Sequence, residues 1–170
     1  MPLTPFHLGP GLLIGLLLFS FIDFPSFLVA SIIIHVEPFL VLAFDIDSRV
    51  HGFFHSFLGG TIVALLLAAV MNRIVKLGYL SSVLEFFKLK QRSSLKKVVS
   101  ASILGVYVHI LLDSLMHSDI QPFYPFDWNP ILDSGVLSSL GVYVLCFWCF
   151  AGALVIYVVR LLFIWKRGSG

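Results

Sequence analysis

The sequence predicts an all-α, polytopic membrane protein with about four to five membrane helices and one short amphipathic helix at the interface. Hydrophobic residues make up 59% of the chain and charged residues only 12%, far from the balance of soluble proteins. The apolar residues form long runs, and most basic residues cluster between or after those runs. The 170 residues suit a single integral membrane domain, residues 1–170. A net charge of +2 argues against a nucleic-acid partner.

The chain begins with two short apolar runs. Residues 8–22 and 26–36 are each shorter than the roughly 20 residues that a full span requires. We therefore expect a hairpin of short or tilted helices. Pro38 predicts a break after the second run, and residues 39–44 then form a short apolar return.

Residues 52–74 form the first full span, and the Gly59-Gly60 pair favours close helix packing in lipid. A short amphipathic segment, residues 82–89, follows with a capping box that runs from Ser82 to Glu85. The whole connector, residues 73–97, is rich in Lys and Arg, which predicts a cytoplasmic location.

Two further spans complete the chain. Residues 98–116 lead away from the cytoplasm, and residues 136–164 return to the basic C terminus. The loop between them, residues 118–134, contains no Lys or Arg. The sequence therefore predicts a plasma-membrane or inner-membrane protein with a cytoplasmic C terminus and with the far ends of these spans at the outer face.

Histidine and aspartate, residue types that can bind metals, are concentrated at these predicted outer ends. His109, Asp113 and His117 are spaced by four, so they share one helical face. An ionisable group inside a span costs roughly 2.5–3.5 kcal/mol, so Asp113 is expected to have a function. His51 and His55 repeat the spacing. We expect one or more divalent ions, zinc first, bound by imidazole and carboxylate groups. The predicted ligands are His7, His35, Glu37, His51, His55, His109, Asp113 and His117.

Some of these residues have a second interpretation. His7 at an interface is equally explained as a hydrogen-bonding anchor, and His35 with Glu37 as a polar helix end that water stabilises. Asp119 either orients His117 as a hydrogen-bonding carboxylate or simply forms a turn. Both interpretations predict that these side chains lie near the membrane surface.

Four motifs, in this order, resemble the YdjM-like membrane-bound predicted metal-dependent hydrolases. They are Thr4-Pro-Phe-His7, His35-Val-Glu37-Pro38, His51-Gly-Phe-Phe-His55-Ser56, and His109-x3-Asp113 followed by Pro122-Phe-Tyr-Pro125-Phe126. The resemblance covers residues 4–126 and implies an integral membrane hydrolase, with a distant likeness to the zinc-dependent phospholipase C and nuclease fold. It implies that the ligands include His7, His51, His55, His109, Asp113 and His117. We expect Glu37 and Asp113 to be the catalytic carboxylates.

The chain departs from the family pattern at two places. His35 stands where the family usually has the first Asp of Asp-x-Asp or Asp-x-Glu, and imidazole bridges two ions poorly. Many members also have an Arg between the His and the Gly that correspond to His51 and Gly52. Arg49 is a candidate to replace that Arg in phosphate recognition.

The resemblance and the residues together predict a hydrolase that cleaves an ester or phosphoester of a lipid or lipid-linked substrate with a metal-activated water. Membrane lipids are the expected partners. The alternative is a metal- or proton-handling transporter or binding protein that uses the same His and Asp residues. A transporter needs polar residues across the inner half of the membrane, whereas residues 98–108 offer only Ser100, Ser102 and Tyr107. The scarcity of polar residues in this segment favours the hydrolase over the transporter. A third interpretation is a structural membrane protein that has no catalytic activity.

Overall fold

The structure, a computed structural model, describes residues 4–46 and 49–168 and contains helices but no strand within these ranges. The all-α prediction is therefore confirmed. The elements are η1 (Thr4–His7), α1 (Leu8–Leu17), α2 (Phe24–Ile33), α3 (Val36–Ala43), η2 (Phe53–His55), α4 (Phe57–Lys76), α5 (Ser81–Phe86), α6 (Leu95–Ser114), α7 (Pro130–Asp133) and α8 (Ser139–Gly168).

Four helical segments in the described ranges are long and apolar enough to cross a membrane. They are Phe24–Ala43, which joins α2 and α3, and Phe57–Lys76, Leu95–Ser114 and Ser139–Arg167. A shorter apolar helix covers Pro5–Leu17. The structure differs from the sequence prediction at Pro38, because α3 continues past this residue to Ala43. Pro38 lies in the first turn of α3, where backbone N–H groups have no partner within the helix, so proline is tolerated.

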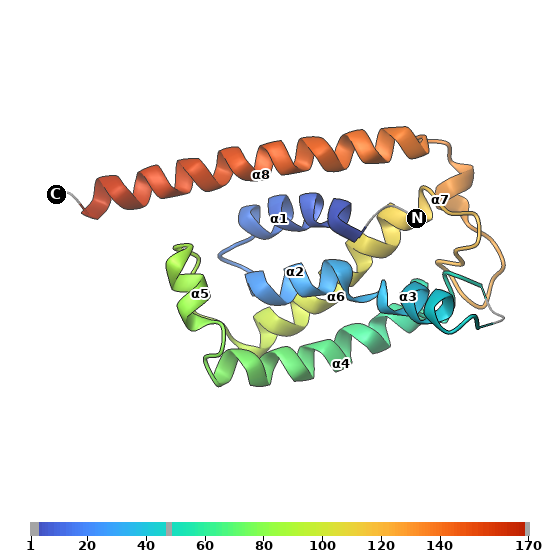
Figure 1. The fold of residues 1–170 in the computed structure, drawn as a ribbon, viewed down its shortest axis with the longest axis horizontal. Helices are drawn as coiled ribbons and strands as arrows, with labels where there is room; N and C mark the ends of the chain where they lie inside the picture. Colours follow the sequence, from blue (N-terminus) through green and yellow to red (C-terminus); the bar gives the residue numbers. More distant parts are fainter. Residues whose placement is uncertain (1–3, 47–48, 169–170) are drawn as a thin grey trace.

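The helices pack around α6, which contacts both α2 and α4, while α1 packs against α2 and α8 (Figure 1). The predicted hairpin of two short helices is thus formed by α1 and α2. Small residues allow the close approach of these helices. A Cβ atom at Gly105 of α6 would lie 2.6 Å from Ala30 Cβ on α2, and one at Gly60 of α4 would lie 2.6 Å from Ile110 Cδ1 on α6. The packing role predicted for the Gly59-Gly60 pair is confirmed at Gly60.

The molecule has two chemically different ends. Figure 1 shows α5 and the C-terminal part of α8 at one end, and the N terminus, α3 and α7 at the other. The basic connector, residues 73–97, therefore lies at the α5 end, together with Lys166 and Arg167. The α3 and α7 end carries the histidines described next.

Candidate metal centre

The helix α6 supplies two adjacent buried ligand residues. His109 and Asp113 are one helical turn apart, both fully buried, and His109 Nε2 lies 3.1 Å from Asp113 Oδ2. The helix ends at Ser114, so His117 lies beyond it. The single helical face predicted for three ligands is therefore formed by His109 and Asp113, and His117 turns to a neighbouring group.

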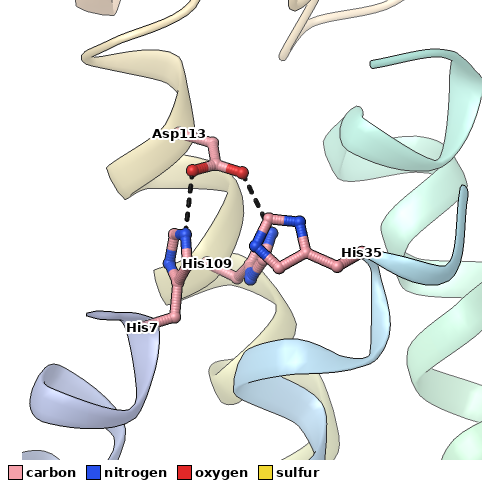
Figure 2. A group of neighbouring side chains, drawn as sticks. All are labelled: His7, His35, His109 and Asp113. Carbon is pink, nitrogen blue, oxygen red and sulfur yellow. Dashed lines mark ion pairs between the residues drawn. The ribbon is translucent and has the colours of Figure 1, made fainter. Parts of the chain in front are cut away.

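Two histidines from the first half of the chain converge on this pair (Figure 2). His7 ends η1, and its Nε2 lies 3.0 Å from Asp113 Oδ1. His35 lies between α2 and α3, and its ring centroid is 4.5 Å from that of His109. One ligand atom from each of His7, His35, His109 and Asp113 lies within 4.8 Å of the others. We call these four buried residues the His35 group.

A second group of ligand atoms lies beside the first and shares Asp113. It consists of His51, His55 and Asp113, again within 4.8 Å of one another, and we call it the His55 group. His55 Nε2 lies 3.8 Å from Asp113 Oδ2. A third set joins His51 to His117 and Asp119. Because Asp113 belongs to the first two groups, its carboxylate can serve two ions.

Three histidines are oriented by hydrogen bonds at Nδ1, and in each the other ring nitrogen, Nε2, is the inner nitrogen that faces the ligand groups. His109 Nδ1 lies 2.8 Å from the Ser31 carbonyl oxygen, His55 Nδ1 lies 2.7 Å from Glu37 Oε2, and His51 Nδ1 lies 2.9 Å from Asp119 Oδ2. A carbonyl or carboxylate oxygen accepts a hydrogen, so each Nδ1 carries the proton and each Nε2 presents a lone pair. Histidines that bind metals have this arrangement.

The inner nitrogens are buried and lack protein partners. Within the described part of the chain, no group donates a hydrogen bond to Nε2 of His51, His55 or His109, or to either ring nitrogen of His35. A buried polar atom without a partner costs about 1–3 kcal/mol. Burial lowers the pKa of His55 and of His117, which disfavours a second proton on either ring.

A cation explains this arrangement better than protons do. A neutral His109 directs its Nε2 lone pair at Asp113 Oδ2, and two acceptors at 3.1 Å repel each other unless positive charge lies between them. A proton on one ring would relieve the contact at that ring only. The unpartnered nitrogens belong to several rings, and one cation can accept lone pairs from several of them at once. Imidazole nitrogens with a carboxylate are a donor set that suits zinc and similar divalent ions. The residues therefore fit a metal centre.

Comparison with known proteins identifies the family of this chain. The model of the YdjM inner membrane protein family matches residues 3–168. The chain belongs to this family. The match covers all four candidate spans and every residue of the His35 and His55 groups. No curated protein and no solved structure matches the chain. With its apolar helices, this YdjM family member is an integral inner membrane protein.

Glu37 lies behind His55. Its Oε2 is hydrogen-bonded to His55 Nδ1, and its Oε1 accepts the backbone N–H of Phe54 at 3.1 Å. Glu37 was predicted to be both a ligand and a catalytic carboxylate. It lies outside the three ligand groups and contacts the candidate ligand His55, and both predicted roles stay predictions.

Asp119 contacts a different histidine from the one expected. It accepts hydrogen bonds from the backbone N–H of His51, at 3.1 Å, and from the His51 ring. Burial raises the pKa of Asp119, but the ring and backbone hydrogen bonds from His51, the charge interaction with His51 and a further backbone hydrogen bond together lower it overall. Arg49 is paired with Asp127 at 3.4 Å at the exposed rim of this end. The Asp119 contact, like that of the Ser31 carbonyl, joins residues distant in sequence, and no local pattern could have revealed either.

The role of Glu37 can be tested by its replacement. We expect Glu37→Ala to weaken zinc binding by about 10–100-fold, because His55 loses the partner that orients its ring. Glu37→Gln should weaken it less, because the amide oxygen can still accept the His55 proton. Titration of purified, metal-depleted protein with zinc measures both effects. Glu85→Ala on α5, at the other end, is the matched control, and equal affinities for all variants would contradict this role.

Proposed function

We propose that this YdjM family member is a membrane-embedded, metal-dependent hydrolase that cleaves an ester or phosphoester of a lipid or lipid-linked substrate. The observation that supports it most is that the two groups sharing Asp113 have different numbers of candidate ligands. The His35 group offers four ligands, as closed zinc sites do, and the His55 group offers three, as catalytic zinc sites do. An ion bound by the His55 group would polarise the substrate and lower the pKa of a water toward neutrality.

The protein residues have separate tasks in this proposal. Asp113 holds both groups together through its two oxygens. His51 and His55 present fixed lone pairs because Asp119 and Glu37 hold their Nδ1 protons. Asp113 would therefore contact the ions directly, whereas Glu37 would be a positioning residue. The divalent ion that we propose is zinc.

The proposed substrate approaches from the outer leaflet. The basic connector, residues 73–97, lies at the end of the molecule opposite the metal centre, and basic loops are typically cytoplasmic. Exposed aromatic side chains follow α6 at the metal-centre end, as expected at a membrane interface. They are Phe123, Tyr124, Phe126 and Trp128. A lipid headgroup at that surface would lie at the depth of the His55 group.

The interior of the bundle favours a hydrolase over a transporter. An apolar cluster packs between the metal centre and the basic end. Its members include Ala30, Ile34, Ala64, Leu67, Ala68, Val98, Val106 and Ile110. A translocation path would need polar groups there. This packing supports a site that is open to one side.

The proposal is tested by metal analysis and turnover together. The full chain is purified in detergent without chelators, its zinc content is measured, and release of the headgroup from diacyl phospholipids and polyprenyl phosphates is followed. We expect at least about one zinc per chain and measurable turnover, both strongly reduced in His55→Ala. Absence of stoichiometric metal would contradict the centre. Bound metal without hydrolysis of any tested lipid would contradict the hydrolase and favour the binding protein.

A further inference from the structure

An apolar groove lies between the α2–α3 segment and α4, directly beside the metal centre. Its volume is about 350 Å³, within the range of ligand pockets. The walls are mostly aliphatic and include Ile33, Val36, Leu40, Val41 and Val63. Both walls belong to candidate membrane spans, Phe24–Ala43 and Phe57–Lys76. The groove therefore lies at the depth of the lipid chains.

One lining residue of the groove contacts the metal centre. Glu37 and Phe54 line one part of it, and Glu37 Oε2 lies 2.7 Å from His55 Nδ1. Phe54 immediately precedes His55, and Ile34, another lining residue, immediately precedes His35. A lipid whose tail follows the groove would therefore hold its polar head on the Glu37 side, next to the His55 group.

We propose that this groove binds one long aliphatic chain of the lipid substrate and so selects substrates by their tail. The inference rests on the proposed function. Glu37 is the charged residue of the lining, and both its oxygens already accept hydrogen bonds from protein groups. The other lining residues are apolar, so a polar occupant would lose its hydration with few hydrogen-bond partners in return. A hydrocarbon chain needs no such partner.

Another apolar pocket of the described structure lacks this connection. It lies against α1 and α8 and is lined by Leu12, Phe87, Leu89, Phe150 and Tyr157. In the described ranges none of these residues hydrogen-bonds to a metal-group residue, as Glu37 of the groove does. A lipid chain there would be remote from the His55 group. Continuity with the metal centre is what assigns the substrate tail to the groove between α3 and α4.

The test combines photocrosslinking with turnover. Full-length protein in phosphatidylcholine vesicles receives phosphatidic acid with a terminal diazirine on one acyl chain, or a polyprenyl phosphate with the same group on its tail. We expect crosslinks on α3 and α4 in the parent. Val63→Trp should reduce them at least about tenfold by filling the groove. Leu40→Trp, on the opposite wall, provides a second variant in case the first does not fold. The more strongly crosslinked probe identifies the tail as acyl or polyprenyl.

The matched control is Val70→Trp, which makes the same change on α4 at a position that is 56% exposed and outside the groove lining. It should leave crosslinking and zinc content unchanged. Val63→Trp should also keep its zinc and its hydrolysis of a short-chain, water-soluble phosphoester, while turnover of the long-chain lipid falls at least about tenfold.

The outcomes separate the groove from the hydrolase. Crosslinks that spread evenly over the lipid-facing helices, or that fall equally in Val63→Trp and Val70→Trp, would overturn the groove even if the parent hydrolyses lipids. Groove-specific crosslinks in a parent without turnover would support the tail site and contradict the hydrolase. Long-chain turnover that Val63→Trp and Leu40→Trp leave unchanged would show that the groove does not select the substrate.

Discussion

Replacement of Asp113 by Asn is expected to remove metal from both groups at once, with a fall in zinc affinity of more than about 100-fold. Asp113 contributes to the His35 group and to the His55 group, so its loss affects two donor sets. It is fully buried, and its two oxygens face His7 on one side and His109 and His55 on the other. The Asn side chain keeps the shape but lacks the negative charge that a divalent ion requires. Elemental analysis and zinc titration measure the effect.

Two controls separate metal loss from damage to the fold. Asp133→Asn removes the carboxylate at the end of α7, which accepts a hydrogen bond from Trp128. Asp133 lies outside the ligand groups, so the zinc content should not change. Asp23→Asn alters another buried carboxylate, the cap of α2, which accepts the Ser26 backbone N–H at 3.1 Å. Its variant should be less stable and still bind zinc. Parent-like zinc affinity in Asp113→Asn would contradict the centre.

Replacement of His35 by Asp is expected to raise lipid phosphoester turnover by at least about tenfold. The imidazole of His35 completes the four-ligand group, and no residue in the ranges 4–46 and 49–168 forms a hydrogen bond to either of its nitrogens. The shorter carboxylate restores the residue that the resemblance leads us to expect at this position. It could bridge two ions, which imidazole does poorly. Initial rates at saturating lipid, with zinc content measured in parallel, give the comparison.

His35→Ala is the matched control, because it removes the imidazole without adding a carboxylate. Its turnover should stay at or below that of the parent. If His35→Asp retains zinc and its turnover does not exceed that of the parent, His35 does not limit the reaction. A similar gain in His35→Ala would show that removal of the ring, rather than the carboxylate, is responsible.

Much of the architecture could be predicted from residue order alone. Three of the four spans follow from the lengths of the apolar runs, and their ends lie within about five residues of the expected positions, as α4 and α6 show. The fourth, Phe24–Ala43, was predicted as a short helix followed by a separate apolar return. Membership of the YdjM family was predicted from four short motifs, and the family match over residues 3–168 confirms it. Pro38 was harder to interpret, because proline breaks a helix interior but is tolerated in a first turn.

The candidate ligands were predicted by residue type and spacing, but their grouping was not. His109 and Asp113 are one turn apart on one helix, so their proximity is a local property. The contacts of Asp119 with His51 and of Glu37 with His55 instead depend on how loops fold over the end of the bundle. Neither partner could be chosen from the sequence, because Asp119 lies 68 residues from His51 and Glu37 lies 18 residues from His55.

The sequence by itself determined that this is a helical membrane protein with His and Asp residues concentrated at one end. Both properties follow from hydrophobicity, helical periodicity and the cost of placing charge in lipid, which act over short stretches of chain. Only the tertiary structure decided that Asp113 joins two groups, that Glu37 stands behind His55, and that an apolar groove begins there. These features arise where η1, the α2–α3 junction, η2 and α6 meet, and such contacts depend on packing between segments far apart in sequence.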